Sequence, residues 1–268
     1  MHRSILAITL FTAAGLLAGC DTATPELEPD VVVVRAFLFA GEPVDDVQLT
    51  ATSALSSTEA QGAPIADAAV FLVKTENVEV SYPLAPKPGE AGFYHYEGDD
   101  LSVAPGDTFF LVVDYQGRLT TAATYIPGEP EAVALSTTHV VIDAATSDDE
   151  PVLGVSWENP EDELHWVSIR NTATVSVPIR RVDVGAAAEP ILPEPETSAF
   201  YQVKAEAFTH YGTHEVRVYR ISNDYFALHQ YTQQPVQRIY EPATNVTNGV
   251  GIFSGFTGVR HTITVQPR

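Results

Sequence analysis

The chain has 268 residues, 45% of them hydrophobic, which is enough to bury a core and excludes a disordered tail or a coiled coil. Its 14 Lys and Arg residues stand against 35 Asp and Glu residues, and the net charge of -21 has the wrong sign for a surface that neutralises nucleic-acid phosphates. A single cysteine, Cys20, excludes internal disulfides and cysteine-based zinc sites.

Residues 1–19 have the parts of a secretory signal peptide, with a basic start and an apolar stretch over residues 5–18. This stretch is shorter than the about 20 apolar residues that span a bilayer. It ends in Leu17-Ala18-Gly19-Cys20, which resembles the lipobox of bacterial lipoproteins. The resemblance implies that residues 1–19 are removed and that the thiol of Cys20 carries the lipid that anchors the protein to a membrane.

Residues 20–30 predict a tether between the anchor and the folded part. They contain Pro25 and Pro29, acidic side chains and almost no apolar material. Acidic residues after the cysteine resemble surface-export signals of lipoproteins in the Bacteroidota, and a solvated linker explains them equally well. The sequence therefore predicts a membrane-anchored lipoprotein and leaves open whether it faces the periplasm or the cell surface.

Residues 31–130 predict short strands separated by turns. The run 31–39 is almost continuously β-branched and aromatic, which predicts a strand buried on both faces, and 47–52 is expected to pair with it. The further predicted strands are 68–74, 79–84, 92–97, 108–115 and 119–124. Short strands at this spacing are typical of an antiparallel sandwich.

Three pieces of this half, 65–70, Gly92-Phe93-Tyr94 and 105–109, resemble the small sandwich of transthyretin-like and carboxypeptidase-regulatory-like modules. The resemblance implies that a tyrosine, here Tyr94, fills the core. Such modules present edges and loops and rarely carry out chemistry.

The second half also predicts strands, with a boundary near Pro127 and Pro130. The predicted strands are 133–142, 152–157, 166–170, 174–184 and 260–265, together with a hairpin of 200–208 and 214–221 around Tyr211-Gly212. One helix is expected after Ser222 or Asn223, with an apolar stripe of Tyr225, Leu228 and Tyr231.

We therefore predict an all-β fold of two antiparallel β-sandwich domains, Ig-like or transthyretin-like, with one short helix in the second. The expected domains are 31–130 and 131–268, the second of which holds a glycine-rich block.

The order of several motifs resembles that of Bacteroidota lipoproteins that carry domain of unknown function 4249. The motifs are Trp157-Glu158-Asn159-Pro160 with Trp166, Ile221-Ser222-Asn223-Asp224-Tyr225-Phe226, Tyr240-Glu241-Pro242, and the block from Asn245 to Gly255. The resemblance covers about residues 31–256; it departs at Trp166, where an aromatic pair with tyrosine is usual. It implies an outer-membrane or surface lipoprotein, often encoded beside TonB-dependent receptors, with no assigned activity.

The glycine-rich block predicts a tight turn where a strand re-enters the sheet, because Asn248-Gly249 and Gly251 allow positive φ angles. It lacks the lysine and the following helix of a phosphate-binding loop.

Catalytic and metal-binding patterns are weak. His210 and His214 could meet Glu206 or Glu215 at a metal only if the predicted hairpin bends them together, since residues four apart on a strand lie about 13 Å apart. Ser254 lacks the Gly-x-Ser-x-Gly order of a nucleophile elbow. We predict no catalytic residues, no metal site and no cofactor.

The aromatic residues offer a candidate ligand platform, formed by Trp157, Trp166, Tyr225 and Tyr231, although packing in the core explains them as well. The sequence favours a binding or accessory component of an outer-membrane assembly, with the membrane and a TonB-dependent receptor as partners and nucleic acid excluded. The alternatives are an extracytoplasmic hydrolase of glycan or peptide and a structural surface lipoprotein.

Overall fold

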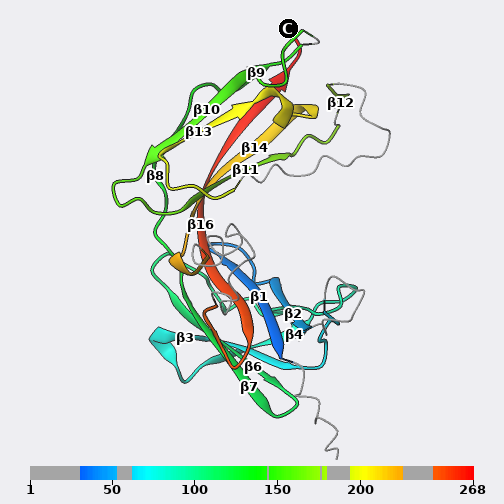
Figure 1. Cartoon of the computed structure of the whole chain (residues 1–268), viewed down its shortest axis with the longest axis vertical. Coiled ribbons are helices and arrows are strands. Elements are labelled where there is room, and N and C mark those ends of the chain that lie inside the picture. Colours follow the sequence, from blue (N-terminus) through cyan, green and yellow to red (C-terminus); the bar gives the residue numbers. More distant parts are fainter. Residues whose placement is uncertain (1–30, 53–61, 144, 176, 180–193, 226–243) are drawn as a thin grey trace, which may run out of the picture.

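The structure, a computed structural model, describes residues 31–52, 62–143, 145–175, 177–179, 194–225 and 244–268 (Figure 1). Within these ranges the chain is nearly all β, which confirms the predicted class. Helical residues are limited there to two 3-10 turns, Thr75–Asn77 and Ala205–Ala207, and to residues 223–225, where the predicted helix begins. The rest of that helix, with Leu228 and Tyr231, lies outside the described residues.

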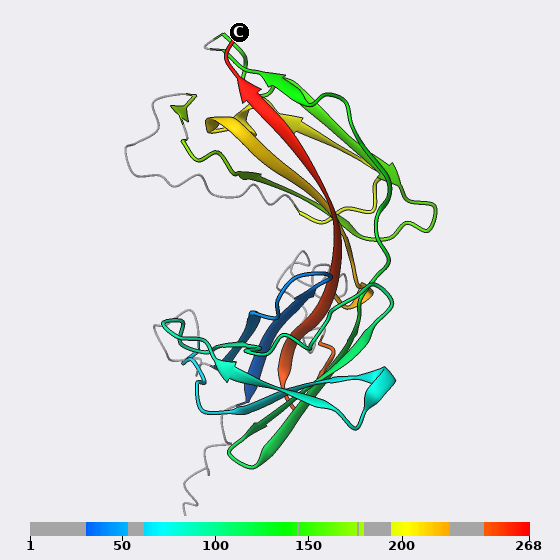
Figure 2. The same cartoon turned by 180° about the vertical axis from the view of Figure 1, so that it is seen from behind.

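The strands form two lobes joined by one long strand (Figures 1 and 2). The lower lobe holds β1 (Val32–Phe39), β2 (Asp46–Ala51), β3 (Ala69–Lys74), β4 (Ser81–Pro86), β5 (Phe93–His95), β6 (Thr108–Tyr115), β7 (Arg118–Tyr125) and β15 (Val246–Thr247). The upper lobe holds β8 (Glu131–Leu135), β9 (His139–Val141), β10 (Pro151–Glu158), β11 (His165–Asn171), β12 (Val177–Pro178), β13 (Phe200–Lys204) and β14 (His210–Ile221). The joining strand is β16 (Val250–Gln266).

One large sheet runs through both lobes in the order β11-β14-β16-β1-β2-β5-β4-β3-β6-β7-β15 and curls into a half-barrel (Figure 2). The first part of β16 pairs in parallel with β1, from Val33↔Val250 to Phe39↔Phe256. Its second part pairs antiparallel with β14. We call the place around Phe256, where the strand passes from one lobe to the other, the waist. A separate sheet, β13-β10-β8, covers the outer side of the upper lobe.

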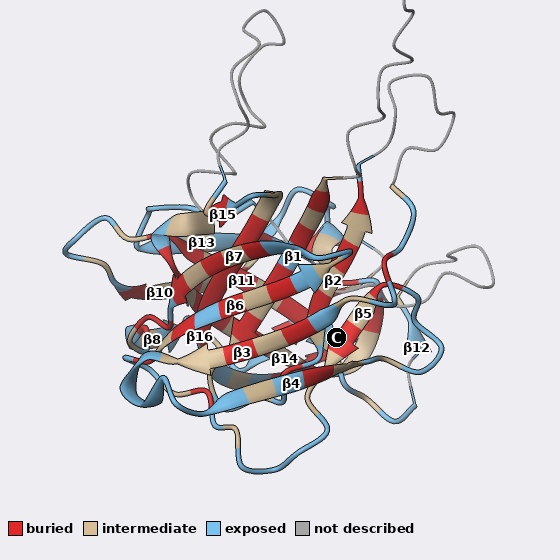
Figure 3. Ribbon diagram, turned by 90° about the horizontal axis from the view of Figure 1, so that it is seen from below, coloured by how far each residue is buried: buried red, intermediate tan, exposed pale blue. Residues whose placement is uncertain are grey.

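Each lobe has its own cluster of buried apolar side chains. In the lower lobe Tyr94 is fully buried, and the backbone N–H of Ala68 donates to its hydroxyl at 3.1 Å, so the expectation that this tyrosine fills the core is confirmed. Buried and exposed positions alternate along β6 and β7 (Figure 3), as expected for a sheet with one face on the core. The upper core lies between the two sheets and includes Val155, Ile169, Val216, Val218 and Ile263.

Several sequence-based expectations about the strands are wrong. Residues 133–142 do not form one strand, because β8 pairs with β10 in the outer sheet while β9 pairs with β16. Residues 200–221 do not form a hairpin, because β13 pairs with β10 in the outer sheet while β14 pairs with β11 and β16. Gly212 lies inside β14. β1 is fully buried on one face only, since Arg35 is exposed and Phe37 and Phe39 are partly exposed. An apolar run does not reveal which sheet a strand joins or how much of its second face is covered.

The glycine-rich block makes the predicted turn at the start of β16. Asn248 has a φ of 58° and Gly251 one of 115°. A Cβ atom on Gly251 would lie 1.9 Å from the carbonyl oxygen of Val34 in β1, so glycine is required for the close approach of the two strands.

Candidate functional site

The motif blocks that lie far apart in the sequence meet at the waist. The hydroxyls of Ser222 and Ser254 lie 2.9 Å apart, and Ser222 Oγ also accepts a hydrogen bond from the backbone N–H of Gly255 at 3.3 Å. The hydroxyl of Thr124, at the end of β7, donates to Asp224 at 3.2 Å. These contacts join the chain after β14 to the glycine-rich block and to the lower lobe.

Asp224 is the titratable group of this buried cluster. Burial raises the pKa of its carboxyl, and hydrogen bonds from Thr124, Ser222 and Asn245 work against this rise by stabilising the charged form. Ser254 has no exposed surface and contacts Ser222, so it has the surroundings of a buried structural hydroxyl.

The motif Trp157-Glu158-Asn159-Pro160 positions the acidic side chain of Glu163, also near the waist. The amide of Asn159 donates to the carbonyls of Glu163 and Thr197, both at 2.8 Å, and its oxygen accepts from the N–H of Glu163 at 2.9 Å. Asn159 therefore fixes the loop before β11. The loop brings the Glu163 carboxylate onto the guanidinium of Arg220 in β14.

The Glu163–Arg220 ion pair forms a wall shared by two cavities. The larger has a volume of about 220 Å³ and is lined by residues of both lobes, among them Tyr125, Gly128, Asn223 and Asp224. The smaller, of about 110 Å³, is lined by Glu158, Glu161 and His165. Burial lowers the pKa of His165, whose ring lies 5.3 Å from that of Trp157, measured between centroids.

An aromatic cluster surrounds Phe256 on the inner, concave side of the waist. Its ring lies 4.9 Å from Phe39, 5.7 Å from Tyr225 and 6.3 Å from Trp166. Phe39 and Trp166 also approach Tyr219, at 5.6 and 6.1 Å.

The structure thus places the four predicted platform residues differently. It brings Trp166 and Tyr225 together around Phe256, both partly exposed. Trp157 is buried in the upper core, on the other face of the sheet, and does not join them. Tyr231 lies outside the described residues, as do Leu17, Ala18, Gly19 and Cys20.

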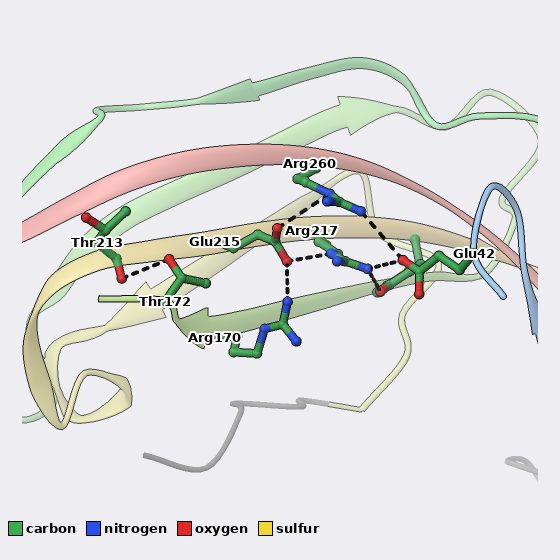
Figure 4. A network of polar contacts seen from close by, with 8 residues as sticks. Glu42, Arg170, Thr172, Thr213, Glu215, Arg217 and Arg260 are labelled. Atoms are coloured by element: carbon green, nitrogen blue, oxygen red, sulfur yellow. Dashed lines mark hydrogen bonds and ion pairs between the residues drawn. The ribbon is translucent and has the colours of Figure 1, made fainter. Parts of the chain in front are cut away.

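A network of charged side chains continues from the aromatic cluster across the upper lobe (Figure 4). Glu215 on β14 accepts hydrogen bonds from Arg217 at 2.6 Å and Arg170 at 3.1 Å, and its second oxygen lies 3.4 Å from Arg260. Arg217 also donates to the hydroxyl of Tyr219 at 2.9 Å and to Glu42 of the lower lobe. We define the inner face as one face of β1, β11, β14 and β16 together with Glu42 from the turn after β1. It carries Arg35, Phe37, Phe39, Glu42, Trp166, Arg170, Glu215, Arg217, Tyr219, Phe256 and Arg260.

Sequence reasoning missed this network. The signal that could have revealed it was the presence of an arginine in each of three predicted strands, Arg170 in 166–170, Arg217 in 214–221 and Arg260 in 260–265, in a chain with few basic residues.

The two histidines singled out from the sequence are buried in β14 and do not flank a turn. His214 contacts the carbonyl of Gly212 through Nδ1 at 3.1 Å and the amide of Asn171 through Nε2 at 3.3 Å. Burial lowers the pKa of His214. In the part of the chain that the structure describes, no three His, Cys, Asp or Glu side chains gather as a metal would require.

The described ranges contain no helix that is both long and apolar enough to cross a membrane.

Comparisons with known proteins identify the family of the chain. No curated protein matches the chain. A solved structure described as the crystal structure of CBD12 from CALX1.2 is similar at 11% identity, with 86% of this chain and 100% of that chain covered, but its TM-score of 0.20 carries no argument about fold or function. The model of the family "Domain of unknown function (DUF4249)" matches residues 20–262. The chain therefore belongs to the DUF4249 family.

Proposed function

We propose that the protein is a bacterial envelope lipoprotein of the type found in the Bacteroidota, anchored in the outer membrane through Cys20. In this proposal it acts as a binding or accessory component of an assembly with a TonB-dependent receptor. The lipobox-like Leu17-Ala18-Gly19-Cys20 and the membership of the DUF4249 family support the proposal.

The observation that carries a binding role is the continuous inner face. Because β16 belongs to both lobes, Phe37 and Phe39 of the lower lobe lie in one surface with Trp166 and Tyr219 of the upper lobe. Aromatic residues and arginine are enriched at protein interfaces, whereas lysine is depleted. The inner face carries four arginines, Arg35, Arg170, Arg217 and Arg260, and no lysine.

The geometry of the anchor agrees with such a role. Val33 pairs with Val250, six residues before the Phe39–Phe256 pair, so β1 begins about 20 Å from the waist. The tether therefore joins the fold at the end of β1 that lies away from the waist, and this attachment point supports an inner face that a partner can reach.

The division into two sandwich domains, 31–130 and 131–268, also belongs to this proposal. The separate cores of the two lobes support it. The shared strand β16 means that the two parts are expected to unfold together.

The test is chemical cross-linking in native membranes, followed by purification of the tagged protein and identification of what is joined to it. Recovery of a TonB-dependent receptor in equal amount is the expected result, and recovery of the lipoprotein alone would contradict the accessory role. The Cys20→Ala variant tests the anchor separately. It should appear in the soluble fraction, and its retention in the membrane would overturn the lipid attachment.

A further inference from the structure

Two arginines of the inner face lie close together, and the repulsion between their charges lowers the stability of the fold. Arg217 on β14 lies directly opposite Arg260 on β16 in the antiparallel register. Like charges at directly opposed positions of neighbouring strands repel each other. Glu215 and Glu42 lie between the two guanidinium groups and compensate this repulsion, with contacts of 3.4 and 3.6 Å to Arg260.

The compensation is incomplete, so the network keeps a positive charge. It contains three arginines, Arg170, Arg217 and Arg260, against two glutamates. The whole chain has a net charge of -21, so this patch has the opposite sign to the molecule around it. An anionic partner would be repelled by most of the surface and attracted here, which fixes where it docks.

Donor groups for such a partner are accessible. The side chain of Arg170 is 54% exposed and that of Arg260 is 57% exposed. Each guanidinium carries five N–H donors in a planar fork, and the fork matches the two oxygens of a carboxylate. Arg170 directs one nitrogen at Glu215, so its outer edge is turned to solvent.

An apolar anchor point adjoins the arginines. Tyr219 accepts a hydrogen bond from Arg217, and its ring lies 6.1 Å from the partly exposed Trp166. Tryptophan, tyrosine and arginine are the residue types that dominate the energy of protein interfaces. The chain bends between the lobes at the place where Glu42 of the lower lobe reaches Arg217 of the upper lobe, so a segment bound to the arginines would lie close to both lobes (Figures 2 and 4).

We infer that the inner face docks an acidic polypeptide segment of a partner protein. Its carboxylates bind Arg170 and Arg260, and an apolar side chain packs against the partly exposed Trp166, beside the buried Tyr219. The inference rests on the proposed function, because it states the chemistry by which the lipoprotein recognises its partner.

The test measures binding to the purified full-length lipoprotein in a neutral detergent. The probe is a short fluorescein-labelled peptide that alternates glutamate and glycine around one central phenylalanine, and fluorescence anisotropy reports the affinity. We expect binding that weakens with salt, because exposed charge pairs are screened. A matched peptide with glutamine in place of glutamate should not bind. Failure of the glutamate peptide to bind at low salt would overturn the inference.

Variants locate the site. The double change Arg170→Gln and Arg260→Gln should weaken binding about tenfold or more. Glu215 keeps its contact with Arg217 in this variant, and each single change is measured as well in case the double variant does not fold. Lys204→Gln is the matched control, because Lys204 is an exposed cation on the outer sheet, paired with Asp149 at 2.8 Å. Equal affinities of the arginine variants and the wild type would contradict the inferred site.

Three further outcomes are informative. An oligogalacturonate of matched charge that binds more tightly than the peptide would overturn a polypeptide partner in favour of an acidic glycan. Recovery of the receptor from membranes without peptide binding would overturn this inference and leave the proposed function standing. Peptide binding without recovery of a receptor would contradict the accessory role and leave the inferred binding of an acidic segment standing.

Discussion

Glu42, in the turn after β1, accepts a hydrogen bond from Arg217 in β14 and thereby joins the lower lobe to the upper lobe. The same carboxylate oxygen lies 3.6 Å from Arg260 in β16. One side chain of the lower lobe thus holds two arginines that face each other in the upper lobe. The contact therefore connects the lobes across the waist, beside the continuous strand β16.

The Glu42→Gln variant should be less stable by about 1–2 kcal/mol, because Arg217 is only 14% exposed and would lose part of the charge that offsets Arg260. Urea unfolding followed by the fluorescence of the two tryptophans measures this. Asp149→Asn is the control, since it removes a partner from an exposed ion pair with Lys204 and should leave the midpoint unchanged. Equal effects of the two changes would show that Glu42 has no special role between the lobes.

Asn159→Ala should cost about 2 kcal/mol and loosen the loop that carries Glu163. The variant loses three hydrogen bonds, two to carbonyl groups and one from a backbone N–H, and leaves these groups without their partner. Hydrogen exchange at residues 160–164 should increase in the variant. The exposed Glu161 of the same loop supplies the control Glu161→Gln, for which no such increase is expected. Unchanged exchange in Asn159→Ala would mean that the loop is held by other contacts.

Gly251→Ala should cost more than about 3 kcal/mol, because the new Cβ would lie 1.9 Å from the Val34 carbonyl oxygen at a φ of 115°. Gly117→Ala separates the steric clash from the strain of a positive φ. Gly117 has a φ of 75° but nothing within 4 Å of a Cβ, so the cost there should be about 1–2 kcal/mol. Denaturant midpoints compare the two, with protease resistance as the readout if Gly251→Ala does not fold. Similar costs would contradict the close approach of β1 and β16.

The strands were predictable because alternation and turn residues are local signals. β6, Thr108–Tyr115, has the bounds expected from the sequence, and the turn at Asn248 precedes β16 as expected. Sheet membership is a long-range property, and no local pattern reveals it. The segments 200–208 and 214–221 therefore read as a hairpin although β13 and β14 belong to different sheets.

The candidate site was predictable only in part, for the same reason. The motif order drew attention to Asn159, Ser222 and Ser254, but the sequence did not show that Ser222 and Ser254 would meet at 2.9 Å. Trp157 and Trp166 looked equivalent as candidate platform residues. Trp157 belongs to β10 of the separate three-stranded sheet and is buried in the upper core, between the two sheets. Trp166 belongs to β11 of the large sheet and lies on its inner face, away from that core.

Asp224 gives the protein a pH dependence of definite sign. Burial raises the pKa of this carboxyl in the folded state above its ordinary value of 3.8, so the folded protein holds the proton more tightly than the unfolded chain does. The resulting stabilisation is fully present below pH 3.8 and is lost as the pH rises through the folded pKa. At neutral pH the ionised Asp224 therefore lowers the free energy of unfolding.

The Asp224→Asn variant should for this reason be more stable than the wild type at neutral pH, and the difference should shrink toward pH 3.8 and below. The amide oxygen can still accept the hydrogen bond of Thr124, so the polar cluster at the waist is expected to persist. Thermal unfolding of both proteins across this pH range measures the difference. Asp143→Asn is an instructive comparison, because hydrogen bonds from Ala145 and Thr146 lower the pKa of Asp143 and the sign of its contribution is opposite. A variant at Asp224 that is less stable than the wild type at neutral pH would mean that the ionised carboxylate stabilises the fold, and would contradict this prediction.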